Sequence, residues 1–499
     1  MRRLWIGLFG VLGGGLSPAL ADDGAVSLAV DAAPGEIEPW LDFRDRLEAT
    51  TAYTVDTDGA QVDTPPVLNS ELRMGARVQR TTGGDLPGSL EAVIELGLGT
   101  GDLWGRTALD GEALPGTEDA NLTLRQAYAR WILANRVRVQ AGAVTSQWGL
   151  GMLANGGQDT WTRGSASFVD ARGGDTVLRG MIATGPHGAH AIKGRGLVLA
   201  GFLDHVLADA TLMDGDRAWQ TGAALTLGGY RRDQAMVGLY GVYRHLDAED
   251  GDTMDARVVD LTGRLPMKLG ARDFTVESEL AVVTGKTTLG GTTDHPAHDL
   301  LQFGGVLRAS CVGEGLGGVL DLIYASGDQN PDDATQHGFR IDANFPSGLL
   351  LYRNVLAAQT GRAVATAGDP DLVGYPSEDL ERFATRGSIT NSLAVFPRFV
   401  WPWETYELYG GPLFAWSEVA WTDPLQTRVV GGVPRNSLGA EPGGYLGTEL
   451  DLGLQWIPTD RDYTGGFELA ALLPGSALAD TEGDTSPVLG GRFLFHYVY

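Results

Sequence analysis

Several features that would identify the class of this protein are missing or scarce in its sequence. Beyond residue 21 it contains no apolar run near the roughly 20 residues that a membrane-spanning helix needs. Cys311 is the only cysteine, so no disulfide can form within the chain. Basic residues are few, because 37 Lys and Arg stand against 63 Asp and Glu and give a formal charge of −26. A charge of this sign argues against a nucleic-acid partner.

Motifs of catalysis are missing as well. The eight histidines show no HExxH or other metal-ligand spacing, and no G-x-S-x-G nucleophile motif occurs. We therefore predict that the protein is not an enzyme, and we expect neither a metal site nor a cofactor.

The N-terminus has the pattern of an export signal. Arg2 and Arg3 precede an apolar run over 4–16, which is followed by Ala19-Leu20-Ala21. A charged start, a short apolar core and a small-x-small cleavage site are typical of a secretory signal peptide. The sequence predicts a signal peptide over 1–21, and 22–38 as a short lead into the first strand.

Aromatic residues occupy alternate positions in the last segment of the sequence, 491–499. Phe493, Phe495, Tyr497 and Tyr499 occupy every second position, so in a strand they share one face. Such a strand is typical of a membrane barrel, which carries aromatic girdles and leaves no free edge. The alternative is an ordinary strand of a soluble β-sandwich. For the barrel, we expect this segment to be the one that the barrel-assembly machinery recognises.

The same period of two recurs along the chain. Over 68–79, apolar side chains fall mostly on even positions and charged ones on odd positions, and 90–96, 136–141, 175–182 and 446–456 alternate similarly. A helix would mix these charges into its apolar stripe, so the period favours strands. The alternation predicts an all-β, transmembrane antiparallel β-barrel over 39–499, with apolar side chains toward lipid and polar ones toward the lumen.

About eighteen strands are expected. They start near residues 40, 68, 89, 122, 136, 175, 197, 218, 235, 255, 273, 299, 317, 390, 406, 446, 464 and 488. The longer connections, among them 146–174 and 327–388, are expected to be extracellular loops. Because a bland loop is rarely as long as 327–388, this segment is either a pore-constricting element or an extra strand pair.

Several short motifs resemble one family. Ala325-Ser326-Gly327-Asp328 with Phe345-Pro346-Ser347-Gly348, and Gly447-Thr448-Glu449-Leu450-Asp451 before Pro474-Gly475, are similar to stretches of the alginate-export outer-membrane porins. A looser likeness joins Val139-Gln140-Ala141-Gly142, Trp148-Gly149 and the segment from Gly174 to Arg179 to their central motif. The resemblance implies an eighteen-stranded barrel that passes an anionic polysaccharide outward through a lumen lined with basic residues.

The residues on the expected inward faces of the strands are the candidates for contact with the solute. Arginine is suited to carboxylates because its planar fork binds them at two points. Acids on the same faces either pair with these arginines or make the pore weakly selective. The candidates are Arg73, Arg77, Arg125, Arg130, Arg136, Arg138, Asp175, Arg179, Arg398, Glu449 and Asp451.

Acidic clusters in two expected loops are weak candidates for Ca²⁺, which prefers oxygen ligands. They contain Asp56 and Asp58 in one loop, and Asp247, Glu249, Asp250 and Asp252 in another. Neither continues into a complete EF-hand loop, and solvated loop charge is the simpler interpretation.

Together these patterns predict a channel in the outer membrane of a Gram-negative bacterium, in contact with membrane lipid and lipopolysaccharide. It would pass a polar, anionic or polysaccharide-like solute by diffusion or export. The alternatives are a weakly selective diffusion porin, and a surface β-protein that binds a ligand without conducting.

Overall fold

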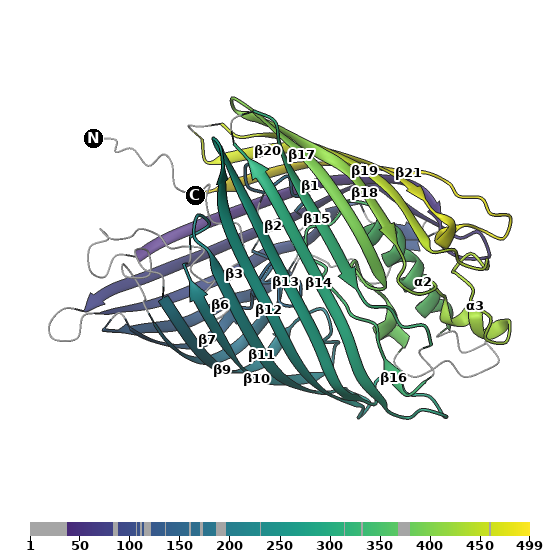
Figure 1. Ribbon diagram of the computed structural model, residues 1–499, viewed down its shortest axis with the longest axis horizontal. Helices are drawn as coiled ribbons and strands as arrows, with labels where there is room; N and C mark the ends of the chain where they lie inside the picture. Colours follow the sequence, from purple (N-terminus) through teal and green to yellow (C-terminus); the bar gives the residue numbers. More distant parts are fainter. Residues whose placement is uncertain are drawn as a thin grey trace.

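The computed structural model is a single closed β-barrel (Figure 1). It describes residues 37–82, 88–105, 107–109, 112–113, 121–134, 136–158, 161–169, 173–185, 196–229, 231–313, 315–330, 333–367, 380–458 and 461–499. The expected signal peptide lies outside these residues, as does nearly all of the expected lead. No helix in the described part is long and apolar enough to cross a membrane.

Eighteen of the 21 described strands form the wall, and the other three have two residues each. The wall strands are β1 Ile37–Thr54, β2 Gln61–Thr82, β3 Gly88–Trp104, β6 Asn121–Leu133, β7 Val137–Thr145, β8 Thr176–Thr184, β9 Gly196–Ala208, β10 Arg217–Gly228, β11 Met236–Asp247, β12 Thr253–Leu269, β13 Arg272–Thr287, β14 His298–Val312, β15 Gly317–Ala325, β17 Ser392–Trp403, β18 Tyr406–Trp416, β19 Tyr445–Trp456, β20 Tyr463–Pro474 and β21 Val488–Val498. The short strands are β4 Ala108–Leu109, β5 Glu112–Ala113 and β16 Thr335–Gln336. The predicted all-β barrel with eighteen strands is confirmed.

Each wall strand pairs antiparallel with its neighbours, and β21 pairs with β1 to close the ring. At this seam the backbone N–H of Leu41 donates to the carbonyl of Tyr499 at 3.0 Å, and the N–H of Tyr499 donates back at 2.8 Å. The start of β1 and the C-terminus lie at the end of the barrel with the short turns, on the left in Figure 1. Short turns are typical of the periplasmic end of outer-membrane barrels, so we expect the long loops to be extracellular.

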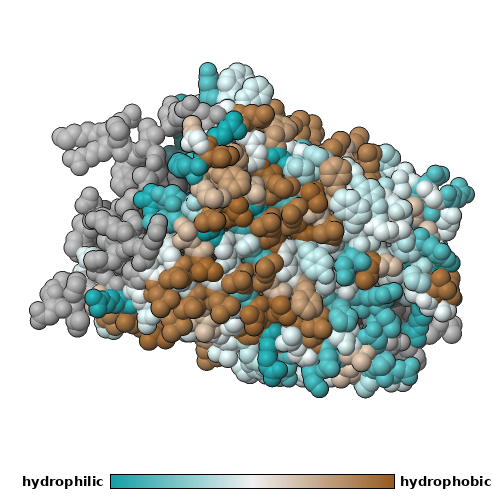
Figure 2. Space-filling model, viewed as in Figure 1, coloured by the Kyte–Doolittle hydropathy of each residue, from teal (hydrophilic) through white to brown (hydrophobic). Residues whose placement is uncertain are grey.

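Apolar side chains cover the outside of the wall. Leu261 and Leu280 are 45% and 55% exposed, while Asp260 and Glu279, the residues just before each, are completely buried inside. Figure 2 shows the result as a hydrophobic band that gives way to hydrophilic residues toward the extracellular end. The alternation predicted from sequence therefore has lipid on its apolar side.

Aromatic pairs border the band at both ends. Trp403 and Tyr406 flank one short turn, with ring centroids 6.0 Å apart. At the other end of the same wall, the rings of Trp416 and Tyr445 lie 5.5 Å apart. Two aromatic girdles around an apolar band are the signature of an outer-membrane barrel, and a closed ring alone satisfies the backbone of a spanning sheet. The protein therefore resides in the outer membrane of a Gram-negative bacterium.

One assigned face was wrong. The sequence places Leu446 on the same outward face as Leu450, but Leu446 is completely buried whereas Leu450 is 50% exposed. The pairing of β18 with β19 shifts by one residue between Ala415 and Trp416, next to Gly447, whose φ is +150°. This bulge turns the start of β19 over, because an extra residue in one strand inverts the faces beyond it.

Two extracellular connections fold into the lumen. The β7–β8 loop (146–175) buries Trp148, Met152 and Phe168 completely. The β15–β17 loop (326–391) buries Leu351 and Phe345 and includes a π-helix, η2 Leu351–Leu356, followed by α2 Ala357–Ala367 and a 3-10 turn, η3 Leu380–Phe383. Both join one hydrophobic cluster with the wall. Two further short helices lie in later loops: α3 Pro424–Val429 follows β18, and η4 Ser476–Leu478 follows β20.

Candidate functional site: the charged lumen

The β7–β8 loop is bound by the wall on several sides. On β12, Asp260 accepts a hydrogen bond from Trp148 Nε1 at 2.7 Å. On β18, both carboxylate oxygens of Glu407 accept the backbone N–H of Gly164, at 2.9 and 3.0 Å. The sequence predicted a long extracellular loop here and did not predict that it enters the lumen. Its actual path depends on charged side chains from strands far apart in the sequence, which no local pattern reveals.

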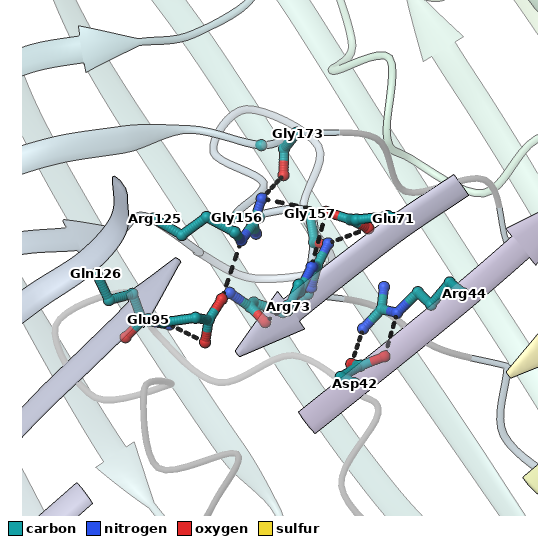
Figure 3. A network of polar contacts seen from close by, with 12 residues as sticks. Asp42, Arg44, Glu71, Arg73, Glu95, Arg125, Gln126, Gly156, Gly157 and Gly173 are labelled. Carbon is teal, nitrogen blue, oxygen red and sulfur yellow. Dashed lines mark hydrogen bonds and ion pairs between the residues drawn. The ribbon is translucent and has the colours of Figure 1, made fainter. Parts of the chain in front are cut away.

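Arg73 and Arg125 hold the middle and the end of this loop (Figure 3). Arg73 is 1% exposed, binds Glu71 at 2.8 Å and donates to the carbonyl of Gly157 at 2.8 Å. Arg125 binds Glu95 at 3.0 Å and donates to the carbonyl of Gly173 at 2.8 Å. Both arginines point inward as the alternation indicates, but acids and loop carbonyls occupy their donors.

Other predicted lumen arginines are paired in the same way. Arg179 makes two 2.8 Å hydrogen bonds to Asp204. Arg398 forms an ion pair with Asp321 at 2.5 Å and donates to the carbonyl of Ala166 at 2.9 Å. A guanidinium has five N–H donors, so one arginine can bind a carboxylate and a loop carbonyl at once.

Three further candidates from β6 and β7 differ from one another. Arg130 lies 3.7 Å from Glu91 and its guanidinium carbon lies 5.3 Å from the centre of the Tyr128 ring. Arg138 is 1% exposed and donates to Gln140. Arg136 is exposed in the tight turn before β7, not on an inward face of the strand.

Arg77, on β2, is half-buried, and its Nε has no hydrogen-bond partner among the described residues. It lies four residues from Arg73, toward the periplasmic end of the lumen. Contact of these arginines with a solute remains a prediction.

The predicted acids also lie inside the barrel. Glu449 is completely buried and accepts backbone N–H groups of the β15–β17 loop, and Asp451 follows two residues later on the same face of β19. Asp175 ends the β7–β8 loop and accepts the N–H of Asn155 at 3.0 Å. Burial, with the nearby charges of Asp342 and Asp209, raises the pKa of Asp175 well above its ordinary value.

The side chains of the acidic loop clusters form hydrogen bonds and ion pairs with other residues of the protein. Asp56 accepts the N–H groups of Asp58 and Ala60 and binds Arg362 at 2.7 Å. Asp250 accepts the N–H of Asp252 at 3.0 Å. Among the residues described, no group of three or more His, Cys, Asp or Glu side chains is arranged to hold a metal ion.

A cavity of about 460 Å³ lies between the β15–β17 loop and the wall from β8 to β14. Its charged lining includes Arg244, which pairs with Asp209, and Arg382, which pairs with Asp216 outside the lining. The acids Asp175, Asp328, Asp342 and Asp423 line it as well. It also includes Arg340 and Arg386 from the β15–β17 loop. The cavity therefore contains arginines and acids together, and two of its arginines are held in ion pairs.

Arg340 and Arg386 are the two arginines of the lining that bind no carboxylate in the described part of the chain. Arg340 donates only to the backbone carbonyls of Ala384 and Arg382. Burial and the positive charge of Arg386 lower the pKa of Arg340 to about 10. Arg386 is exposed to the cavity at a φ of +50°, and in the described part of the chain neither guanidinium binds a carboxylate. Guanidinium groups bind carboxylates strongly, so these two are the candidates in this cavity for binding an anion.

Sequence reasoning missed this pair because both residues lie in a loop without periodicity. It also missed Asp260, Glu279 and Glu407, which bind the β7–β8 loop. The only local signal was an acid on the inward face of a strand, and that signal does not distinguish a loop-binding acid from one that pairs with an arginine.

Solved structures share this architecture. The chain aligns with Pseudomonas aeruginosa OccK2 (OpdF) at a TM-score of 0.51 and 11% identity, covering 93% of this chain and 97% of that chain. It aligns with P. aeruginosa OccK9 (OpdG) at a TM-score of 0.51 and 14% identity, covering 93% and 98%. A structure of OccK2 in complex with glucuronate matches with a TM-score of 0.51 and 12% identity.

Comparison with models of protein families and with curated proteins found no match. Identities of 11–14% relate the folds alone. With the closed eighteen-stranded wall, the two aromatic girdles and the inward loops already described, they show that this chain has the fold of an outer-membrane β-barrel porin.

Proposed function

We propose that this protein is a channel through which small anionic solutes diffuse across the outer membrane. The observation that carries the proposal is the pair Arg340 and Arg386, whose guanidinium groups bind no carboxylate in the described structure, in a cavity whose other arginines are bound to acids. Fixed charges in a lumen set its selectivity and its width sets the size limit, so no covalent chemistry is needed.

The solute is either a polysaccharide or a small carboxylate. The sequence motifs resemble alginate-export porins and suggest a polyanion, whereas one structural neighbour was solved with glucuronate, a single sugar acid. Both inward loops narrow the lumen, and the cavity of about 460 Å³ suits a molecule of a few rings at most. These observations support a small carboxylate more than a polysaccharide.

Planar-bilayer recording of the refolded mature chain tests the proposal. We expect stable channels whose reversal potential in a salt gradient reports anion preference, and glucuronate should lower the chloride current. Block by long uronate oligomers instead would favour polysaccharide export. Cation preference without block would overturn the proposal in favour of a general porin, and silent membranes would favour a barrel that does not conduct.

Arg386→Asn makes this test specific. Asparagine tolerates a positive φ, so the substitution removes the charge without straining the loop. We expect the ratio of anion to cation permeability to fall by roughly two-fold or more, because one of the two candidate arginines is lost. Arg428→Asn is the control, since Arg428 is an exposed arginine on α3 outside the cavity lining. An equal effect of both substitutions would show that the cavity pair has no special role.

A further inference from the structure

Glu279, on β13, binds the tip of the β7–β8 loop through its backbone. Its Oε2 accepts the N–H of Leu150 and, at 3.4 Å, the N–H of Met152, and its side chain is completely buried. On the neighbouring strand, Asp260 fixes the start of the same tip through Trp148, whose ring stacks on Tyr240 at 4.8 Å.

Glu449, on β19, binds the tip of the β15–β17 loop in the same manner. Its carboxylate accepts three consecutive N–H groups, those of Leu349, Leu350 at 2.8 Å and Leu351 at 2.7 Å. Glu449 is also completely buried, and so is the side chain of Leu351. One carboxylate therefore satisfies three donors that would otherwise be left without partners at the start of η2.

Each tip contains a glycine that makes the close approach feasible. A methyl group at Gly149 would lie 2.6 Å from Cδ of Glu279, and one at Gly348 would lie 2.6 Å from Oε1 of Glu449. Distances below 3 Å would force the tip away from the carboxylate. The two loops thus share one arrangement, in which a Gly-Leu step is seated on a buried glutamate of the wall.

The two tips are also joined to each other. The N–H of Asp342, in the β15–β17 loop, donates to the carbonyl of Met152 at 2.8 Å. The N–H of that same Met152 belongs to the group bound by Glu279. Releasing one tip from its glutamate therefore removes a support from the other loop.

We propose that Glu279 and Glu449 are the positioning residues that hold the two loops in the lumen and so set its open cross-section. This rests on the proposed function, since a cross-section has meaning only for a lumen that conducts. A buried N–H group that loses its acceptor is costly, and no other side chain accepts these N–H groups in the described structure. Loss of either carboxylate should release the tip of its loop from the wall.

The experiment uses the full chain refolded in lipid, as wild type, Glu279→Ala and Glu449→Ala. We expect each alanine variant to raise the single-channel conductance by roughly half or more, because the narrowest part of the lumen widens. Amide hydrogen exchange at the tip that was released should accelerate by about ten-fold or more, as for any segment whose local opening becomes easier. Glu279→Gln and Glu449→Gln keep an accepting oxygen and should restore most of the wild-type behaviour.

Glu277→Ala is the matched control. Glu277 lies two residues before Glu279 on the same face of β13, so its loss removes the same charge from the lumen without touching a recorded loop contact. If an alanine variant does not refold, Gly149→Ala or Gly348→Ala displaces the same tip while the carboxylate remains, and the same increases are expected.

The outcomes separate the two proposals. A conducting wild type with unchanged conductance in both alanine variants would overturn the role of the glutamates and leave the channel function intact. Equal increases for Glu277→Ala and Glu279→Ala would overturn it too, since charge alone would then explain the effect. A silent wild type would overturn the channel function, and unchanged amide exchange in the variants would then overturn the holding role separately.

Discussion

Buried arginines of this lumen each serve two partners. Arg73 and Arg398 bind an acid of the wall and also donate to a carbonyl of the β7–β8 loop. Removing one partner of such a buried pair leaves the other charge uncompensated, which costs far more than the pair contributes. The arginines that alternation alone would assign to solute binding therefore position the loop, and the proposed function assigns the anion to Arg340 and Arg386 instead.

Asp175 offers a test of buried charge in the loop. Burial raises its pKa, with Asp342 and Asp209 adding to the effect, so the folded protein holds this proton to a higher pH than the unfolded chain does. The stability that the proton provides is present below the ordinary value of 3.8 and is lost as pH rises through the folded pKa.

Asp175→Asn should therefore leave stability unchanged below about pH 4 and increase it at neutral and alkaline pH, since the amide keeps an acceptor for the N–H of Asn155. Unfolding by urea at pH 4 and pH 8 measures this. A variant that is less stable than wild type at pH 8 would show that the charged form is favoured in the folded protein.

Among the strands, position along the membrane normal decides what a substitution costs. Leu261 lies at the middle of β12 and Leu269 at its periplasmic end, 45% and 65% exposed on the outer wall. An arginine facing lipid costs about 2–4 kcal/mol at the midplane and about 0–1 kcal/mol near the interface.

We expect Leu261→Arg to lower the unfolding free energy of the refolded barrel by about 2–4 kcal/mol and Leu269→Arg by at most about 1 kcal/mol. Reversible denaturant unfolding in vesicles, followed by tryptophan fluorescence, measures both. Equal costs would mean that β12 does not cross the membrane at the depth assigned to it.

The sequence predicts an element well when the interactions that form it join residues close together in the chain. A period of two is local, and it located every wall strand and put Arg73, Arg125 and Arg179 inside the barrel. The bulge beside Gly447 broke the period and reversed Leu446. The path of the β7–β8 loop depends on hydrogen bonds to residues more than 100 positions away, such as Asp260 and Glu407, and no local pattern carries that information.

At the scale of the whole molecule, the loop inside the barrel connects strands of the wall that are not neighbours. The β7–β8 loop binds β2 through Arg73, β18 through Glu407 and β21 through Arg492, which donates to the carbonyl of Val169 at 2.8 Å. Arg492 also pairs with the completely buried Glu468 of β20. The wall and its inner loop should consequently unfold together.

Arg492→Ala would leave the carboxylate of Glu468 buried without its cation. We expect it to lower the unfolding free energy by about 3–5 kcal/mol, the usual cost of breaking a buried pair. Arg231→Ala is the matched control, because its pair with Asp233 is exposed at a turn and should contribute about 0–1 kcal/mol. Comparable losses for both variants would show that Arg492 does not hold the loop and wall together.

The seam between β1 and β21 has a consequence for the order of assembly. Arg73 lies one strand to one side of this seam, and Arg492 lies on its other side, yet both bind the same β7–β8 loop from within. Once β21 has joined β1, the wall is continuous and the loop would have to enter through the mouth of the barrel to reach both arginines. Insertion of the loop before the ring closes avoids this detour, so the loop would act as an internal template on which the first and last strands are brought together.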